Sequence, residues 1–467
     1  MHIKNRGKKL LSELLAENNI NLDMPCGGGG VCGKCKIKAK GALSSFSDAE
    51  IRLLSDAEKQ NGVRLACKTF VFGDVEIDHD YDGKFEVMQS RAFNVINEEK
   101  CIAAIDLGTT FIEAKFYSQD GKTLLKHGKI KNPQTKYGAD IVSRIMFSKE
   151  SDGREKLRKE LFSAISELAG DFYDKIERCV IVGNTSMLHF YSGLDTSKIA
   201  TYPFEPETLF GYWEKNVFLP RCISSYVGGD TVAAILASDM LIRKAPSLLV
   251  DIGTNGEMAL FDGEKLFVAS TAAGPALEGA SISYGMIAKS GAIKHIFNDG
   301  SYETVGDSAP KGICASGLID AVSYMLKTKK ISKDGYLSDE FEINKSGVFL
   351  LPKDIRNFQL AKAAIKAGIE TLLNITGISV NELNKLYITG ALGSNADVEN
   401  CMEVGLIPKI DKNKIILLEN AALCGASMIL KDEKNIKISD EIARKAKHIE
   451  LSLSDEFSKK YIDSLSF

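Results

Sequence analysis

Apolar and polar residues follow two different patterns along this chain. In the first part, apolar residues recur at helical spacing over 8–18, and the short apolar runs at 63–66 and 69–77 have the length of strands. Residues 89–100 end in a polar Glu-Glu-Lys run and predict a short linker. From residue 101 onward, apolar strand patterns alternate with amphipathic helical patterns. We therefore expect a small α+β unit followed by an α/β fold.

The α/β part contains two copies of one strand–turn–strand plan. Residues 101–117 run from an apolar strand through Asp-Leu-Gly-Thr-Thr into a second strand, and 247–265 repeat the plan with Asp-Ile-Gly-Thr-Asn. A looser pair, 176–187 and 383–395, places an apolar strand between a helix and a glycine-containing turn. Two matching pairs in the same order predict a duplicated domain. The predicted units are a first domain, a linker and two lobes, at 1–88, 89–100, 101–245 and 246–467.

Four of the ten cysteines are clustered near the start of the chain. Cys26, Cys32 and Cys35 share one glycine-rich loop, and Cys67 follows on a strand-like segment. An iron–sulfur cluster takes four thiolate ligands, and glycines let a loop turn sharply and aim N–H groups at sulfur. Zinc sites usually use paired C-x2-C units, whereas this region has one such unit. We expect a [2Fe–2S] cluster, with a zinc site and unrelated thiols as the alternatives.

The repeated Asp-x-Gly-Thr turns have the pattern of a phosphate-binding site. Glycine lets the backbone approach a phosphate, while N–H and hydroxyl groups of the turn donate to its oxygens. An aspartate at the strand end can hold Mg²⁺, usually through water. One such turn is equally typical of an ordinary β-hairpin, but the duplication favours a nucleotide site. The candidates are Asp106, Gly108, Thr109 and Thr110 in the first turn, and Asp251, Gly253, Thr254, Asn255 and Gly256 in the second.

Together these segments resemble the five-motif signature of the acetate and sugar kinase, heat-shock chaperone and actin superfamily. The resemblance implies an actin-like ATPase with two ribonuclease H-like halves that binds ATP and Mg²⁺. It also implies that Asp106 and Asp251 surround the metal and that Asp230 orients a water, although a helix N-cap is the other reading of Asp230. The matching stretches are the phosphate motifs 104–110 and 250–257, the connecting helices 228–234 and 420–426, and the adenosine motif 387–393 with Gly390 and Gly393.

The segment 271–286 (TAAGPALEGASISYGM), which follows the second phosphate turn, has three readings. It contacts phosphate through Gly274 and Gly279, it faces a partner, or it is a glycine-bearing turn that leads into a helix. The sequence does not decide among them.

The whole chain resembles the ATP-dependent reductive activators of corrinoid proteins. That resemblance implies a ferredoxin-like (β-grasp) domain fused to the ATPase, and transfer of one electron from the cluster to Co(II) of a corrinoid protein in a methyltransferase system, which restores Co(I). The implied partners are that corrinoid protein and a low-potential electron donor, and a homodimer is left open. The more specific stretches include MPCGGGGVCGKC, NPQTKYGADIVSRI, VGNTSM and GICASGLIDAV.

Charge and composition narrow the function classes further. The net charge of −3 over 467 residues gives no electrostatic case for nucleic acid or an anionic membrane as a partner. No apolar run approaches the ~18 residues of a membrane helix, so we expect a cytoplasmic protein. The other six cysteines are expected to be small buried apolar side chains. A redox-sensing ATPase, an activator of another low-potential metalloenzyme and a small-molecule kinase are the alternative functions.

Overall fold

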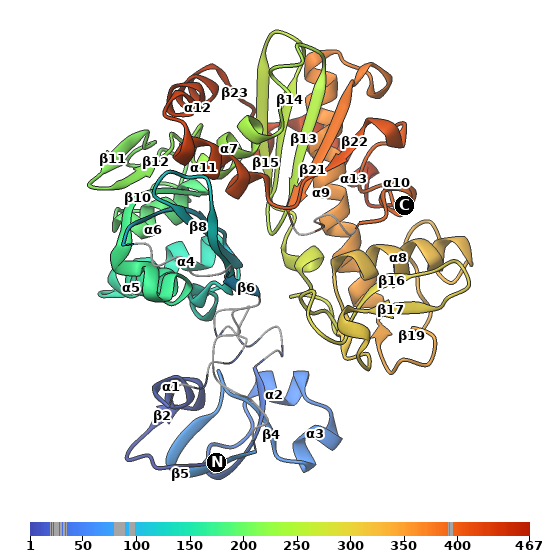
Figure 1. Cartoon of the computed structure of the whole chain (residues 1–467). Coiled ribbons are helices and arrows are strands. Elements are labelled where there is room, and N and C mark those ends of the chain that lie inside the picture. Colours follow the sequence, from blue (N-terminus) through green and yellow to red (C-terminus); the bar gives the residue numbers. More distant parts are fainter. Residues whose placement is uncertain are drawn as a thin grey trace.

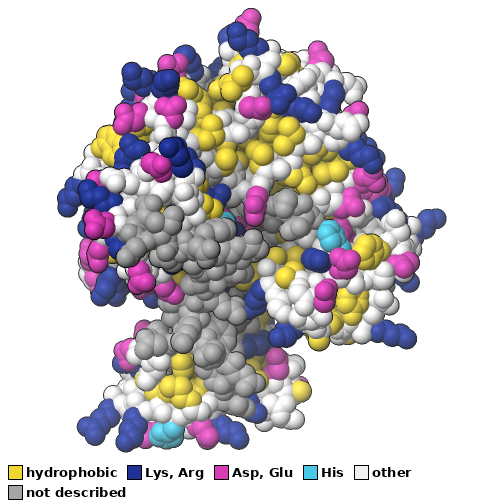
Figure 2. Space-filling view, in the orientation of Figure 1, with side chains coloured by type: hydrophobic (Ala, Val, Ile, Leu, Met, Phe, Trp, Pro, Cys, Tyr) yellow, Lys and Arg dark blue, Asp and Glu magenta, His cyan; other side chains and the backbone are white. Residues whose placement is uncertain are grey.

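The computed structural model describes the chain except for residues 19, 21, 23–27, 29, 31, 32, 34, 79–88, 93–98, 391 and 393–395. In Figure 1 the N-terminal domain, drawn in blue, lies apart from the two lobes, which run from green to red. Figure 2 shows basic and acidic side chains interspersed over the visible face, in keeping with the net charge of −3. Among the described residues, no helix is both long and apolar enough to cross a membrane.

Within its described residues, the N-terminal domain consists of a small sheet and three helices. Its strand order is β1-β5-β3-β4, and β2 also pairs with β5. Along β3, Ile37 and Ala39 are buried while the alternating Lys36, Lys38 and Lys40 are exposed, as the two-residue period of a strand requires. The expected helix over 8–18 begins only at Leu11, because the two residues before it pair with β5. The elements are β1 His2–Ile3, β2 Lys9–Leu10, α1 Leu11–Glu17, β3 Lys36–Leu43, α2 Asp48–Leu53, α3 Asp56–Gln60, β4 Val63–Leu65 and β5 Phe70–Asp78.

The first lobe is built on a seven-stranded sheet of order β11-β12-β10-β7-β8-β9-β6. Its central strand β7 is almost wholly buried, which explains the continuous apolar run of the sequence. The expected linker is wrong over Gln89–Ala92, because these residues form β6 and pair with β9. The elements are β6 Gln89–Ala92, β7 Cys101–Leu107, β8 Phe111–Ser118, β9 Leu124–Lys131, η1 Pro133–Tyr137, α4 Ile141–Ser148, α5 Gly153–Ala169, η2 Gly170–Lys175, β10 Ile176–Gly183, α6 Thr185–Ser192, β11 Tyr212–Glu214, β12 Val217–Leu219 and α7 Gly229–Ala237.

The second lobe is built on a six-stranded sheet of order β22-β21-β13-β14-β15-β23. Its longest helix, α9, begins at Pro352 and ends before Gly377, a glycine in the left-handed conformation that suits a helix C-cap. The elements are β13 Ser247–Ile252, β14 Gly256–Phe261, β15 Leu266–Thr271, α9 Pro352–Thr376, η5 Val380–Glu382, β21 Lys385–Gly390, α10 Val398–Glu403, η7 Lys412–Lys414, β22 Ile415–Leu417, α11 Ala421–Lys431, α12 Lys434–Lys445, β23 Lys447–His448, η8 Leu451–Leu453 and α13 Asp455–Asp463.

The two large sheets repeat one topology. In each, three consecutive strands form an antiparallel meander, β7-β8-β9 or β13-β14-β15. A later strand, β10 or β21, then pairs in parallel with the first strand of the meander, and a further one extends the sheet in parallel. The duplication expected from the two pairs of sequence matches is therefore present in the strand order, as two ribonuclease H-like halves.

A subdomain is inserted between β15 and α9 of the second lobe, and it is drawn in yellow in Figure 1. A three-stranded sheet of order β17-β16-β18 packs against α8, and β19 and β20 form a separate hairpin. Its first turn, η3, leads from the second phosphate hairpin into this subdomain. The elements are η3 Pro275–Glu278, β16 Ala292–Ile296, β17 Tyr302–Thr304, η4 Val305–Asp307, β18 Gly312–Ile313, α8 Ala315–Lys327, β19 Phe341–Glu342 and β20 Phe349–Leu350.

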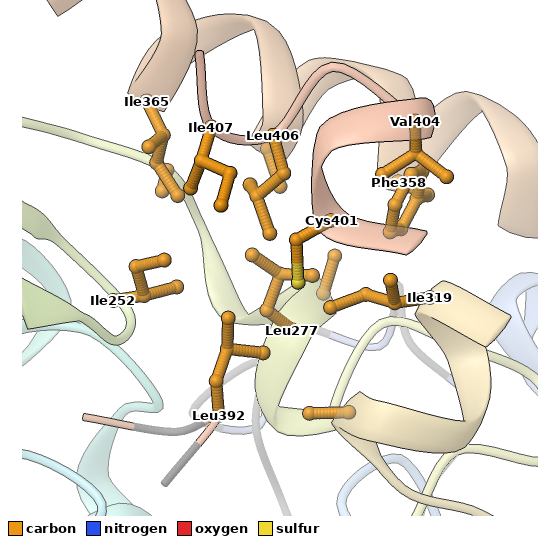
Figure 3. Packing of buried hydrophobic residues seen from close by; sticks show 14 of the residues in the cluster. Ile252, Leu277, Ile319, Phe358, Ile365, Leu392, Cys401, Val404, Leu406 and Ile407 are labelled. Atoms are coloured by element: carbon orange, nitrogen blue, oxygen red, sulfur yellow. The ribbon is translucent and has the colours of Figure 1, made fainter. Parts of the chain in front are cut away.

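The two lobes meet where α7 crosses α11. At the crossing, a Cβ on Gly425 would lie 2.0 Å from the carbonyl oxygen of Ala233, so only glycine permits this approach. The core of the second lobe continues beneath the inserted subdomain. There Cys401 is fully buried among side chains that include Leu277 and Ile319 (Figure 3). This cysteine therefore has the structural role expected of it.

Candidate functional site

A cleft of about 390 Å³ lies between the two lobes and is lined by both repeated turns. The N-terminal end of α8, from the inserted subdomain, closes another side of it. Ten of the residues expected from the sequence line this cleft, namely Asp106, Gly108, Thr109, Thr110, Asp230, Asp251, Gly253, Thr254, Asn255 and Gly390.

Each phosphate hairpin turns two carboxylates toward the cleft. Asp106 on β7 lies directly opposite Glu113 on β8, and Asp251 on β13 lies directly opposite Glu257 on β14. Directly opposed residues point to the same face of a sheet, and all four of these side chains line the cleft. The duplication therefore includes a glutamate that the Asp-x-Gly-Thr pattern does not contain.

Two glycines permit close approaches at the floor of the cleft. A Cβ on Gly108 would lie 2.5 Å from the carbonyl oxygen of Phe111, within the first turn. Gly390 has a φ of +91°, and its Cβ would lie 2.3 Å from Oδ1 of Asp251. A side chain at Gly390 would therefore displace the aspartate of the second turn. This explains why the adenosine motif has a glycine at this position.

Two carbonyl groups of the first turn accept hydrogen bonds from side chains of the segment 132–145. Asn132 donates from Nδ2 to the carbonyl oxygen of Gly108 at 2.8 Å, and Arg144 donates from Nη2 to that of Thr109 at 2.6 Å. Arg144 is fully buried, and it also donates to the Gly138 carbonyl and to Oε1 of Gln134. Burial lowers the pKa of Arg144 to about 9. A buried positive charge therefore lies directly behind the first phosphate turn.

Asn420 joins the second lobe to the carboxylates of the first. Its Nδ2 donates to Oδ2 of Asp106 at 3.0 Å and to Oε2 of Glu113 at 3.1 Å. Its Oδ1 accepts the N–H of Leu423 and so caps the start of α11. One amide therefore fixes both the start of the connecting helix and the orientation of the Asp106 carboxylate.

The buried carboxylates of the cleft repel one another. Burial, together with the charge of Asp230, raises the pKa of Asp106 to about 8 and that of Asp251 to about 7. The same two causes raise the pKa of Glu257 well above its ordinary value. Burial alone would also raise the pKa of Glu113, but hydrogen bonding to His127 and the charge of Lys129 lower it to about 2.

This donor set fits a divalent cation, since a dication relieves the repulsion among buried carboxylates. Among the residues that the structure describes, no three acidic, histidine or cysteine side chains converge closely enough to hold one metal ion directly.

Asp230 is not a helix N-cap. The N-cap of α7 is Gly228, and Asp230 lies two residues further on, in the first turn of the helix. Its Oδ1 accepts the backbone N–H of Thr231 at 2.7 Å, and its carboxylate faces the cleft. Burial raises its pKa above the ordinary aspartate value. The N-cap reading is therefore wrong, and the expected role as water-orienting group stays a prediction.

Four other predicted glycines are not among the described residues that line the cleft. Gly256 faces Ile365 of α9, and Gly279 lies against the backbone of Met286, so both serve close packing. Gly274 donates its N–H to the carbonyl of Thr254, which ties the segment 271–286 to the second turn. Gly393 lies outside the described residues.

The described part of the cysteine motif has two thiols in contact. Sγ of Cys35 and Sγ of Cys67 are 3.3 Å apart and buried, as adjacent ligands of one cluster would be. Cys26 and Cys32 lie outside the described residues. Of the scattered cysteines, five are buried as expected, but Cys424 is exposed on α11, so the expectation is wrong there.

A buried ion pair supports the segment that carries Cys67. Glu50 of α2 is fully buried and accepts from Nε of Arg64 at 2.8 Å. It also accepts the N–H of Leu65 at 3.1 Å and the hydroxyl of Thr69 at 2.9 Å, so one carboxylate holds the chain on both sides of Cys67. Burial opposes ionisation, but the Arg64 and Ser47 hydrogen bonds prevail and lower the pKa of Glu50 to about 2.

Comparisons with known proteins cover all three parts of the chain. Residues 245–467 match the family described as the C-terminal domain of RACo, the ASKHA domain. Residues 101–243 match the RACo middle region, and residues 2–72 match the 2Fe–2S iron–sulfur cluster binding domain. A corrinoid activation enzyme of Eubacterium limosum is 31% identical, over 78% of this chain and 70% of the relative.

The chain belongs to the RACo family. A methylated amine-specific Co(II) corrinoid protein reductase of Methanosarcina barkeri is 27% identical, over 78% of this RACo-family chain and 76% of the relative. The solved structure of a reductive activator for a corrinoid, iron–sulfur protein covers 98% of this chain and 95% of its own, with a TM-score of 0.73 and 26% identity. The expected fold class, a ferredoxin-type domain followed by an actin-like ATPase, is confirmed.

Several residues of this RACo-family cleft were not singled out by sequence reasoning. Glu113 and Glu257 were detectable as the polar positions that face Asp106 and Asp251 across each hairpin. Asn184, whose Nδ2 donates to the Thr109 hydroxyl at 3.1 Å, stands in the quoted stretch VGNTSM. The remaining three are Glu278, Arg144 and Asn420, whose contacts with the turns depend on tertiary structure.

Proposed function

We propose that this chain is an ATP-dependent reductive activator that transfers one electron to Co(II) of a corrinoid protein and restores Co(I). The observation that carries the proposal is the union, in one chain, of a cysteine-ligand domain with a two-lobed cleft that bears matched phosphate turns. The 31% identical corrinoid activation enzyme supports the same substrate class.

In this proposal, Cys26, Cys32, Cys35 and Cys67 hold a [2Fe–2S] cluster. Such a cluster moves one electron at a time, which suits a one-electron reduction. Cys35 and Cys67 supply two adjacent buried thiols, and the Glu50–Arg64 pair keeps the Cys67 segment in place.

The cleft residues bind and orient the nucleotide. Thr110 and Thr254 offer hydroxyl donors from opposite lobes, and backbone N–H groups of the turns offer more. Asp106 and Asp251 hold Mg²⁺ through water, and Asp230 orients the attacking water. Because these groups come from both lobes, a bound nucleotide favours a closed arrangement of the two lobes. Hydrolysis of the nucleotide removes this stabilisation of the closed arrangement.

The coupling of ATP hydrolysis to the reduction of Co(II) has a thermodynamic reason. When the donor is less reducing than the Co(II)/Co(I) couple, each 59 mV of deficit costs about tenfold in a one-electron equilibrium. A deficit of ~200 mV is about 4.6 kcal/mol, at about 2.3 kcal/mol per charge per 100 mV. A nucleotide-driven change in affinity for the Co(II) partner can offset an amount of this size.

The electron donor, the oligomeric assembly and the location in the cell belong to the same proposal. The donor is a low-potential electron carrier, and a homodimer is an assembly to be tested. A cytoplasmic location suits the thiolate ligands and the buried thiols, because that compartment keeps cysteines reduced.

The direct test is an anaerobic assay with reduced donor, Mg·ATP and a purified corrinoid protein, in which Co(I) is followed by its absorbance. The proposal predicts Co(I) formation that requires both this chain and ATP. A Co(I) yield that does not depend on ATP would instead favour a protein that carries electrons without coupling to the nucleotide. ATP turnover that requires a sugar or carboxylate substrate would favour a kinase.

A further inference from the structure

One carboxylate oxygen bridges the two phosphate turns. Thr110 of the first lobe and Thr254 of the second both donate their hydroxyl hydrogens to Oε2 of Glu278, at 2.7 Å and 2.6 Å. The two hydroxyl oxygens are 3.4 Å apart, so they converge on a single acceptor. These are the same hydroxyls that the phosphate-binding pattern assigns to phosphate oxygens.

Glu278 is joined directly to the inserted subdomain. It ends the short helix η3, and Gly279 follows it with a φ of +80°. A Cβ on Gly279 would lie 2.7 Å from the backbone nitrogen of Met286, so the chain turns tightly here. Met286 in turn donates its N–H to the carbonyl oxygen of Ile313, just before α8. The carboxylate is therefore linked through the backbone to the subdomain that supplies α8 to the cleft wall.

The Thr110 and Thr254 hydroxyls can bind only one anionic group at a time, either the Glu278 carboxylate or a phosphate. A threonine hydroxyl has one hydrogen, so Thr110 and Thr254 each donate to one acceptor at any moment. A carboxylate and a phosphate oxygen that share these donors would also repel each other, since both are negatively charged.

We propose that the Glu278 carboxylate is an internal competitor of the nucleotide's phosphate groups, and that nucleotide binding releases it from Thr110 and Thr254. This inference rests on the proposed function, because it takes ATP as the ligand, and it adds a regulation of that same site. Release of Glu278 frees η3 from the two phosphate turns, so the inserted subdomain changes its position when the nucleotide binds. Nucleotide affinity is thereby set below what the phosphate turns alone would give.

The test measures nucleotide affinity in the full-length, cluster-loaded protein. Isothermal titration with Mg²⁺ and a non-hydrolysable ATP analogue is carried out on the wild type, on Glu278→Ala and on Glu278→Gln. Adenosine is the matched ligand control because it has no phosphate. Glu264→Ala is the matched protein control, since Glu264 is an exposed glutamate in the turn after β14 of the same lobe.

Glu278→Ala is expected to bind the analogue about tenfold more tightly than the wild type, which corresponds to about 1.4 kcal/mol. Glu278→Gln keeps the size of the side chain but loses its charge, and is expected to give a smaller gain. Adenosine affinity and the Glu264→Ala protein should not change. If the alanine variant fails to fold, as judged by circular dichroism and thermal unfolding of the full chain, the glutamine variant decides.

Tighter analogue binding is a result that general damage to the fold would not produce. Equal or weaker binding by the variants would overturn the inference, because Glu278 would then be neutral or part of the nucleotide's own ligand set, and the proposed function would stand. If neither the wild type nor the variants bind the analogue, the proposed ATPase function fails, and the inference fails with it.

Discussion

The buried carboxylates are the residues whose chemistry most directly decides how this cleft behaves. With pKa values of about 8 and 7, Asp106 and Asp251 carry protons over much of the neutral range unless a cation replaces them. The folded chain therefore binds more protons than the unfolded chain between about pH 4 and 8, because the ordinary pKa of aspartate is 3.8. In that window, the contribution of these groups to stability falls as the pH rises.

A divalent cation should reverse this trend, because it takes the place of the protons. We expect Mg²⁺ with a non-hydrolysable ATP analogue to raise the unfolding temperature more at pH 8 than at pH 6. Differential scanning fluorimetry at both pH values, with and without the ligands, measures the difference. Asp251→Asn removes one of the titrating groups and should reduce it. An equal increment at pH 6 and pH 8 would contradict the account.

Glu50 shows the opposite direction of pKa shift, in the N-terminal domain. Its pKa of about 2 lies below the ordinary 4.5, so its contribution to stability is complete above about pH 4.5 and is lost as the pH falls toward 2. The shift corresponds to about 3 kcal/mol, at 1.36 kcal/mol per pKa unit. Part of this reflects the donors that a neutral side chain would leave unpaired around Cys67.

Glu50→Gln is therefore expected to lower the free energy of unfolding of the N-terminal domain by about 3 kcal/mol at pH 7. Urea unfolding of the full chain, followed by loss of the visible cluster absorbance, reports this domain selectively. Glu76→Gln, an exposed position on β5, should change it by less than about 0.5 kcal/mol. Matching midpoints for Glu50→Gln and the wild type would show that the ion pair does not support the Cys67 segment.

At the scale of elements, the sequence predicted the strands and turns whose pattern repeats along the chain. It did not predict the elements that depend on contacts between distant residues. The strands at 101–107 and 247–252 and their turns were predictable, because two similar hairpins in one chain seldom arise by chance. The subdomain between β15 and α9 was not predicted, because its strands are two to five residues long and lack a measurable period. Strand β6 was missed because its pairing with β9 depends on sheet register rather than on local sequence.

The residues of the candidate site also form two groups. Local motifs predict the first group, and only tertiary contacts bring the second to the cleft. Ten cleft residues were predicted from the repeated turns, the adenosine motif and the first connecting helix, because those motifs are local. Arg144, Asn420 and Glu278 act through bonds to residues of the two phosphate hairpins that lie 24 or more positions away. Such contacts leave no signal in spacing, although Arg144 and Asn420 lie in stretches quoted for the two resemblances, and Glu278 lies in the glycine-bearing segment 271–286.

The crossing of α7 and α11 depends on the missing side chain of Gly425. A Cβ there would meet the Ala233 carbonyl at 2.0 Å, so Gly425→Ala must move the helices apart. We expect a loss of about 1–3 kcal/mol in stability, as for other overpacked sites, measured by thermal unfolding. Cys424→Ala, on the exposed side of the same helix, is the control and should change little. Equal unfolding temperatures for the two variants would contradict the close crossing.

At the scale of the whole molecule, the arrangement separates electron transfer from nucleotide binding. The N-terminal domain lies apart from the two lobes of the ATPase in Figure 1. Cys35 and Cys67 belong to that domain, whereas residues of both lobes line the cleft. Because β6 joins the sheet of the first lobe, the segment that follows the cysteine domain is partly built into the ATPase.

The central claim is that nucleotide chemistry in the cleft drives the one-electron reduction. The most direct measurement is the anaerobic yield of Co(I) on a corrinoid protein, with the donor held at a fixed potential above that of the Co(II)/Co(I) couple. The account predicts that Mg·ATP raises the yield for the wild type, that Asp251→Asn abolishes the increase while keeping its cluster absorbance, and that Cys35→Ser gives no Co(I). A wild-type yield that is the same with and without ATP would contradict it.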